Sequence, residues 1–243
     1  ILDAWKASRA TLVAAPDNRD SQAFGYTDFG SPGNVVSDVM IKDLGIRTIR
    51  FANGVMLNLK QTDFEDNRIR YSLKIDGGDL AFGVKDAPLG VFMSSAYSSG
   101  GLGKHDYDDL QSLLAGTTVS AAFNSNDDYF GGFGVVAPAD LELQMDVLAA
   151  YATDPGYRSD ALRLFRRPLP ESYARLYATP GSALSVDAAA IMTDSDPRFA
   201  LAPLEKMQSI DFDQLKAKLG KALLTNRLEI GMVGDLDEQA AIA

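Results

Sequence analysis

Three patterns in the sequence predict an α+β fold in which helices pack on a mainly antiparallel sheet. Apolar and polar residues alternate between residues 48 and 75, as they do in strands that bury one face. A short glycine-containing turn interrupts this alternation, which favours antiparallel pairing of the flanking strands. Over much of 87–223 the apolar residues recur instead with helical spacing. Strands and helices grouped in this way pack as the layers of an α+β domain.

The first 45 residues differ from the rest of the chain. Turn-forming residues such as Pro16 and Gly25 are scattered through them, and their periodicity is weak. We therefore interpret 1–45 as a linker from a preceding domain, with a helical segment at 2–12 that ends that domain. Residues 46–243 are expected to form a single domain, which the chain's end truncates in its last helix.

The first strands are predicted from short-range patterns. Asn53-Gly54 lies between alternating residues, and this dipeptide is the strongest short signal for a hairpin turn. Residues 68–75 then place four polar side chains on one face and four apolar side chains on the other. This pattern indicates a half-buried antiparallel strand that ends at Gly77-Gly78.

Helices dominate the rest of the chain, with three more strands between them. Asp235 and Glu238 have the spacing of a capping box at the start of a last helix. Further strands are expected at 119–123, 129–136 and 228–233. Helices are expected from residue 87, at 106–116, from Pro138, at 159–165, 171–177, 183–192 and 212–223, and after residue 235.

Composition argues against several classes of function. A net charge of -10 and a pI near 4.6 argue against a nucleic-acid partner, because binding to phosphates needs clustered Lys and Arg. No apolar run approaches the roughly 18 residues of a membrane-spanning helix. His105 is the one histidine and there is no cysteine. The usual imidazole and thiolate ligands of zinc therefore cannot be assembled from this chain alone.

His105 and several acidic residues are the remaining candidates for metal binding. His105 lies at a predicted helix start, and we interpret it as a solvated residue there. One histidine with flexible carboxylates makes a poor zinc site, and we interpret the acidic cluster at 106–109 as a favourable first helical turn. The other acidic residues lack the ordered ligand spacing of a calcium loop. No metal or cofactor site is expected in this chain. The acidic residues considered are Asp106, Asp108, Asp109, Asp127, Asp128, Asp194 and Asp196.

Serines and glycines form two further groups of interest. The serines between Ser94 and Ser99 have no histidine close in sequence to act as a base, so we interpret them as small residues that pack a helix against the sheet. Gly131, Gly132 and Gly134 lie within a strand pattern and no Lys-Ser follows, which argues against a phosphate loop. They favour close backbone approach, or a sheet edge open to an extended peptide.

The segment Phe51–Phe64 resembles the first hairpin of domains in the pitrilysin and insulinase family of zinc metallopeptidases. Many members carry a comparable NGV…LKPTDF string, where this chain reads NGVMLNLKQTDF. The order that follows is also similar to that family: a strand ending in paired glycines, a helix, a glycine-rich stop, an acidic leucine-containing helix, and a strand running into Val233–Asp237. The resemblance covers residue 34 to the C-terminus.

Active domains of that family carry H-x-x-E-H on the helix after the paired glycines, where the histidines bind zinc and the glutamate activates water. Phe92 and Ala96 stand at the histidine positions and cannot ligate a metal, and Ser95 is too weak an acid to replace the glutamate. No His or Glu occurs between residues 86 and 104, so a shift of register does not restore the motif. When Gly101-Leu102 is matched to the Gly-Thr after the motif, the five motif positions are Phe92, Met93, Ser94, Ser95 and Ala96.

Family members are similar to four stacked copies of one domain, in which the first copy carries zinc and the third is degenerate. The resemblance implies that this chain is a third, non-catalytic domain of a zinc metalloendopeptidase, with residues 15–33 as the linker from the second copy. Its role would be to form part of the peptide-substrate chamber and to support the zinc-bearing domain. Zinc would come from elsewhere in the same polypeptide or from a partner subunit.

Two alternatives stay open. The chain could be an inactive assembly protein, similar to the core subunits of respiratory complexes that share this fold, or a free-standing acidic binding domain. By itself it is not expected to be an enzyme. Relatives in Gram-negative bacteria are often periplasmic, which favours the same location here.

Overall fold

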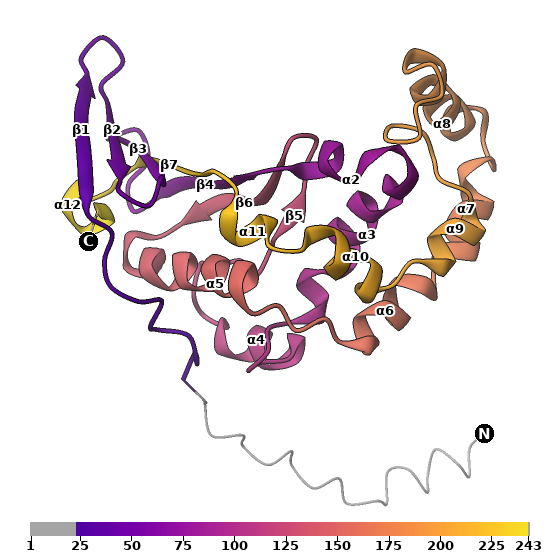
Figure 1. Ribbon diagram of the computed structural model, residues 1–243, viewed down its shortest axis with the longest axis horizontal. Helices are drawn as coiled ribbons and strands as arrows, with labels where there is room; N and C mark the ends of the chain where they lie inside the picture. The colour runs from indigo at the N-terminus through magenta and orange to yellow at the C-terminus, as the bar shows by residue number, and fades with distance from the viewer. Residues whose placement is uncertain (1–22, 243) are drawn as a thin grey trace, which may run out of the picture.

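Residues 23–242, which the computed structural model describes, are built around a seven-stranded sheet (Figure 1). The strand order is β1-β2-β3-β7-β4-β6-β5. β3 and β7 run parallel and the other neighbouring strands run antiparallel, so the prediction of a mainly antiparallel α+β fold is confirmed. The strands are β1 (Val35–Ile41), β2 (Ile46–Phe51), β3 (Met56–Gln61), β4 (Ile69–Asp76), β5 (Asn124–Ser125), β6 (Tyr129–Val136) and β7 (Leu228–Gly234).

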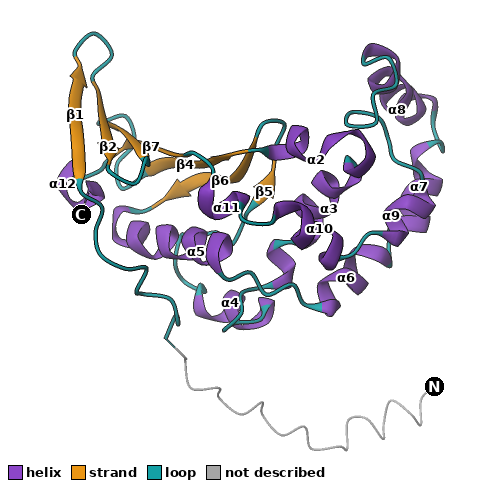
Figure 2. Cartoon of the chain, viewed as in Figure 1, coloured by secondary structure: helices purple, strands orange, loops and turns teal. Residues whose placement is uncertain are grey.

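Helices pack against one face of this sheet, and Figure 2 shows α5, α10 and α11 along that side. The helices of the described chain are α2 (Gly78–Asp86), α3 (Pro88–Ala96), α4 (Tyr107–Leu113), α5 (Leu141–Thr153), α6 (Ser159–Arg166), α7 (Leu169–Leu176), α8 (Pro180–Met192), α9 (Leu204–Ser209), α10 (Phe212–Leu219), α11 (Ala222–Thr225) and α12 (Glu238–Ile242), with short 3-10 turns at Ser98–Gly100 and Pro138–Asp140. No helix within 23–242 is long and apolar enough to cross a membrane.

β4 lies near the middle of the sheet and has the alternation expected of it. Ile69, Tyr71, Leu73 and Ile75 are buried in the core against the helices, while the polar residues between them point to the other face. The side chains of Arg70 and Lys74 are exposed there. One face of the sheet therefore carries the core, and the opposite face is polar over β4.

β1 corrects the expectation that the whole of 1–45 is a linker. It pairs with β2 from Val35 to Ile41, and a turn at Gly45, with φ of 61°, joins the two strands. Six of its seven residues are exposed, so neither face of the strand is buried in the core. Without a buried face there is no period-two pattern, which is why the sequence did not reveal this strand. The expected helix at 2–12 lies outside the described residues.

The first hairpin and the last strand form as predicted. β2 and β3 pair around Asn53-Gly54, with Gly54 at φ of 90°, as the dipeptide requires. β7 lies between β3 and β4, and it brings the end of the chain back to the centre of the sheet.

Three local predictions are wrong in detail. Residues 119–123 form no strand, because the backbone N–H and C=O of Ser120 are bonded by the side chain of Gln144 on α5. The helix expected at 212–223 is divided into α10 and α11 by Gly220, whose φ is 50°. A glycine with positive φ is a common helix end.

The last helix is also capped differently from the prediction. Asp237, not Asp235, accepts hydrogen bonds at the start of α12, from the N–H groups of Gln239 and Ala240. Asp235 instead accepts from the N–H of Asn67, which fixes the end of β7 beside the start of β4. The sequence analysis placed the cap two residues too early, at Asp235, because an Asp occupies both positions.

Candidate functional site

Helix α3 carries the five positions that match the metallopeptidase motif, and it lies in the core. Phe92, Met93 and Ala96 are almost completely buried. The ring of Phe92 packs edge-on against Phe165 of α6 at 4.9 Å and tilted against Phe212 of α10 at 5.0 Å, measured between ring centroids. The residue that the resemblance matches to the first ligand position is therefore part of an aromatic cluster.

These residues do not fit a zinc ion. Phe92 and Ala96 have no donor atom, and the side chain of Ser95 is exposed at the surface of α3. Between residues 23 and 242, no group of three or more His, Cys, Asp or Glu side chains could hold a metal ion. Catalysis by a metal-activated water has no support from the side chains of α3.

The start of α3 is held tightly against α2. Pro88 begins the helix, where its missing N–H needs no partner. A Cβ at Gly90 would lie 1.9 Å from Oδ1 of Asp79, so a side chain at position 90 would force the Asp79 carboxylate to move. Burial raises the pKa of Asp79, and the hydrogen bond that Ser125 Oγ donates to it at 2.5 Å opposes that rise.

Two serines of the 94–99 group fasten the motif helix to the segment that leads into the sheet. Ser94 Oγ donates to the C=O of Ser125 at 2.8 Å and accepts from the N–H of the same residue. Ser98 Oγ makes the same pair of hydrogen bonds with Phe123. The packing interpretation explains both side chains, since their oxygens are already engaged with backbone.

His105 corrects a prediction, because it is buried rather than solvated, with 3% of its surface exposed. Its Nε2 accepts a hydrogen bond from the N–H of Gly25 at 2.9 Å, and its ring stacks on Phe24. A Cβ at Gly25 would lie 3.1 Å from that nitrogen. His105 therefore anchors the chain that leads into β1, and it is not paired with a serine.

The same anchor includes a tyrosine and a lysine. Tyr26 donates from its hydroxyl to Asp154 at 2.7 Å and accepts from the N–H of Lys104. Burial is the main reason that the pKa of Tyr26 is raised to about 12, so the hydroxyl keeps its proton and its hydrogen bond at neutral pH. Lys104 Nζ also donates to the C=O of Gly25. This anchor could not be predicted, because it joins residues about 80 positions apart.

Several of the acidic residues have structural roles. Asp106 and Asp109 form a capping box at the start of α4, as the interpretation of this cluster as a first helical turn predicts. Asp196 forms an ion pair with Arg198, which lowers the pKa of that carboxyl to about 2. The backbone carbonyls of Asp127 and Asp128 accept hydrogen bonds from the start of α2.

The glycines of β6 serve close backbone approach. Gly131 has φ of 151°, and a Cβ there would lie 1.9 Å from the carbonyl oxygen of Leu73 on β4. Gly132 faces the carbonyl of Ala122 and Gly134 faces the ring of Tyr71. β5 pairs only with Phe130 and Gly131, so β6 lies next to the end of the sheet. On its outward side Phe133 is 62% exposed.

Comparison with solved structures gives clear likenesses at low sequence identity. The periplasmic protease PqqL from Escherichia coli matches 99% of this chain with a TM-score of 0.75 and 14% identity. The ferredoxin protease FusC, in complex with Arabidopsis ferredoxin, matches 99% with a TM-score of 0.72 and 11% identity. A peptidase M16 inactive domain from Pseudomonas fluorescens matches 81% with a TM-score of 0.63 and 17% identity.

The chain has the fold of a peptidase M16 domain. The expected likeness to the pitrilysin and insulinase type is thus confirmed at the level of the fold, including its likeness to a domain described as inactive. The chain spans about a quarter of the length of PqqL and of FusC, at 26% and 27%. No protein-family model matches the sequence, and no curated protein shows significant sequence similarity to it.

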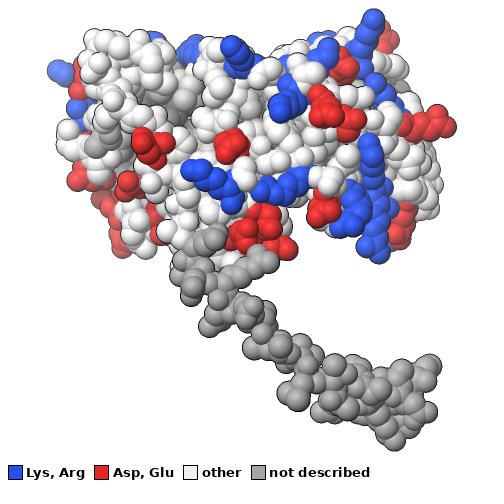
Figure 3. Space-filling model, turned by 60° about the horizontal axis from the view of Figure 1, so that its bottom comes forward, with Lys and Arg blue, Asp and Glu red and all other residues white. Residues whose placement is uncertain are grey.

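Charges of both signs are interspersed on the face of this M16 fold that Figure 3 shows, and neither sign forms a broad field there. Ion pairs join some of the charged side chains of the described residues. Arg47 of β2 bridges Asp38 of β1 and Glu238 of α12, at 2.6 and 2.9 Å. The last helix is thereby tied to the first hairpin of the described chain.

Proposed function

We propose that this chain is a non-catalytic domain of a zinc metallopeptidase of the pitrilysin and insulinase type. The observation that supports the proposal lies on α3, the helix that the sequence resemblance matches to the zinc motif. Phe92 and Ala96, at the positions matched to the two histidines, are buried apolar side chains. Zinc and the general base would be supplied elsewhere, in the same polypeptide or by a partner subunit. The chain itself would perform no hydrolysis.

The proposed role is to form part of the wall of a peptide-substrate chamber. Support comes from the exposed polar side chains of β4 and from Phe133 of β6, which is 62% exposed and lies beside Ser72 of β4 near the margin of the sheet. Addition of a peptide strand to a sheet edge uses backbone hydrogen bonds for affinity and side-chain contacts for specificity. Phe133 would supply such a contact.

Peptide turnover by the complete gene product, with any subunit that co-purifies, tests this role. Replacing Gly131 would be uninformative, because a side chain there collides with β4. Phe133→Asp is the better variant, and Phe64→Asp is its matched control, since Phe64 is 85% exposed on the loop after β3. We expect Phe133→Asp to raise KM about fivefold or more through loss of an apolar contact, with kcat little changed.

The control variant should keep the KM of the unaltered protein. Equal KM values for all three proteins would contradict the chamber role. If the complete gene product hydrolyses no peptide and contains no zinc, the peptidase assignment is wrong and the alternative of an inactive assembly protein is favoured.

One surface of the described chain suits assembly with other protein under either reading. Helix α8 is apolar on nearly all sides, and none of its residues is buried within the described chain. Leu184, Ile191 and Met192 are 68%, 77% and 86% exposed. A helix that is hydrophobic all round is normally covered by protein. Such a surface suits stable assembly with another domain or subunit, in a peptidase or in a purely structural complex.

A further inference from the structure

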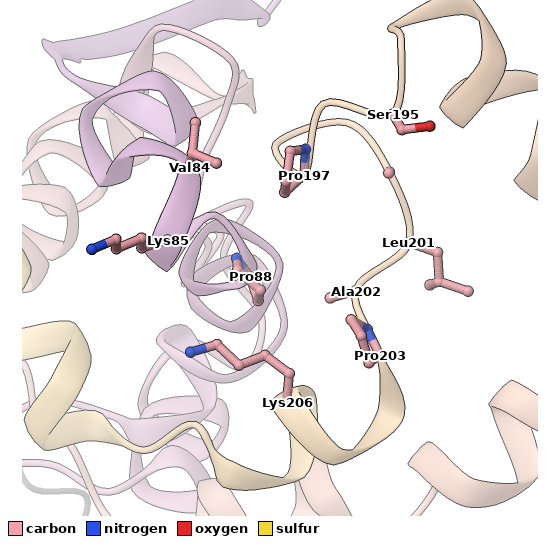
Figure 4. Close-up of a pocket in the computed structure, with 10 residues that line it drawn as sticks. Val84, Lys85, Pro88, Ser195, Pro197, Leu201, Ala202, Pro203 and Lys206 are labelled. Carbon is pink, nitrogen blue, oxygen red and sulfur yellow. The ribbon is translucent and has the colours of Figure 1, made fainter.

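A cleft of about 300 Å³ lies between the junction of α2 and α3 and the loop that joins α8 to α9 (Figure 4). Its volume is at the lower end of the range for sites that hold small ligands or a few residues of a peptide. It lies apart from β6 and from the aromatic cluster around Phe92. Neither the motif helix's degenerate positions nor the sheet edge contributes to its lining.

Two lysines give this cleft a positive end. Lys85 at the end of α2 and Lys206 on α9 both line it, and in Figure 4 both side chains extend toward the α2 side, away from the loop that carries Leu201. Within residues 23–242 neither ammonium group forms an ion pair or a hydrogen bond, and no Asp or Glu lines the cleft. In a chain with a net charge of -10, two unpaired lysines at one opening favour an anionic ligand.

The remaining walls are mainly apolar and rigid. Pro88 forms one side, and Pro197, Leu201 and Pro203 lie on the loop opposite. The loop is held in place because the hydroxyl of Tyr173 donates to the C=O of Ala202 at 2.6 Å. Proline rings have fixed backbone angles, so little conformational entropy is lost when a ligand packs between these walls.

We propose that this cleft binds the C-terminal carboxylate of a peptide whose last residues are apolar. The carboxylate would accept charge-assisted hydrogen bonds from Lys85 and Lys206, while the adjoining side chains would pack against the prolines. Charge complementarity selects this occupant over a neutral or cationic one. The inference deepens the proposed function, since it names the peptide end that this domain holds, but its test is a binding measurement and does not depend on turnover.

The test uses the full 243-residue chain and a fluorescent pentapeptide of Leu, Ala and Pro, made with either a free C-terminal carboxylate or a C-terminal amide. Binding is measured by fluorescence anisotropy. We expect the acid to bind about tenfold or more tightly than the amide, as the loss of one charge-assisted hydrogen bond implies. The double variant Lys85→Gln with Lys206→Gln should bind both peptides equally weakly.

Lys42→Gln is the matched control, because Lys42 lies in the β1–β2 turn at a distance from the cleft in sequence and in fold. It should retain the preference for the acid, and circular dichroism should show that all variants keep the same secondary structure. Equal binding of acid and amide by the unaltered chain would overturn the proposal. So would displacement of the acid peptide by an equal concentration of acetate, which would mean a simple anion site without peptide selectivity.

A loss of acid preference in the double variant, together with unchanged KM for Phe133→Asp, would separate the two ideas. These results would support the cleft as a peptide-binding site and contradict the proposed chamber role of β6. An acid preference that the double variant retains, together with a raised KM for Phe133→Asp, would support β6 as the peptide contact and contradict the proposal for the cleft.

Discussion

At the residue scale, the chemistry of the motif helix depends on three positions. Phe92 and Ala96, at the positions matched to the two histidines, are apolar side chains buried in the core. Ser95, at the position matched to the glutamate, is exposed at the surface. The sequence matches these positions to the motif by resemblance and shows that none of them carries an imidazole or a carboxylate. It could not show that Phe92 would be surrounded by Phe165 and Phe212, because those residues lie on helices about 70 and 120 positions away.

Substitutions at Phe92 and Ser95 should have different effects on the free energy of unfolding, because Phe92 is in the core and Ser95 is at the surface. Phe92→His should lower the free energy of unfolding by about 3 kcal/mol or more, because it removes ring packing and buries an imidazole without a partner. Ser95→Glu should change it by less than about 0.5 kcal/mol, as for other exposed positions. Urea unfolding measures both, and similar values for the two variants would show that Phe92 is not a core residue.

The titration of the Asp79 carboxyl should contribute to the pH dependence of the free energy of unfolding. Because burial raises its pKa above the ordinary value of 3.8, the folded protein binds this proton more tightly than the unfolded chain. The contribution of Asp79 to stability is therefore full below about pH 4 and is lost as pH rises through the folded pKa. Asp79→Asn keeps the shape of the side chain but cannot ionise.

We therefore expect Asp79→Asn to gain stability relative to the unaltered protein as pH rises from about 4 to 7. Because both proteins contain the same other carboxyls, the difference between them cancels the contributions of groups with a lowered pKa, such as Asp196. Denaturant midpoints over this pH range provide the measurement. A constant difference between the two proteins at all pH values would contradict the account of Asp79.

At the element scale, the sequence predicts elements that have a buried face and misses elements that lack one. β4 was predicted because its alternation is complete, and the hairpin at Asn53-Gly54 because the turn chemistry is specific. β1 was missed because its residues are exposed on both faces. The break at Gly220 and the side-chain pairing of Ser120 depend on backbone angles and long-range contacts, which periodicity does not encode.

Glycine substitution tests how closely β4 and β6 approach. Gly131→Ala should destabilise the protein by at least about 2 kcal/mol, because the backbone angle is unfavourable for alanine and its Cβ would collide with Leu73. Gly181→Ala in α8 is the matched control, since nothing lies within 4 Å of a Cβ there. It should be neutral or stabilise by at most about 1 kcal/mol. Equal effects on thermal unfolding would contradict this packing.

At the scale of the whole molecule, the fold separates a core face from surfaces that contact nothing within the described chain. In Figure 1 the β1–β2 hairpin and α8 rise on the same side, at opposite ends of the molecule. Both carry exposed apolar residues, among them Val36 and Ile191. These exposed apolar surfaces support the proposal of a domain that works beside others.

The zinc content of the purified 243-residue chain tests the central claim most directly. The chain is equilibrated with excess Zn²⁺, freed of unbound metal by gel filtration, and measured by elemental analysis, with a peptide-hydrolysis assay on the same sample. We predict a zinc stoichiometry near zero and no hydrolysis, because the motif positions on α3 have no ligands. Retention of one zinc per chain, with peptide hydrolysis that a chelator abolishes, would contradict the account of a non-catalytic domain.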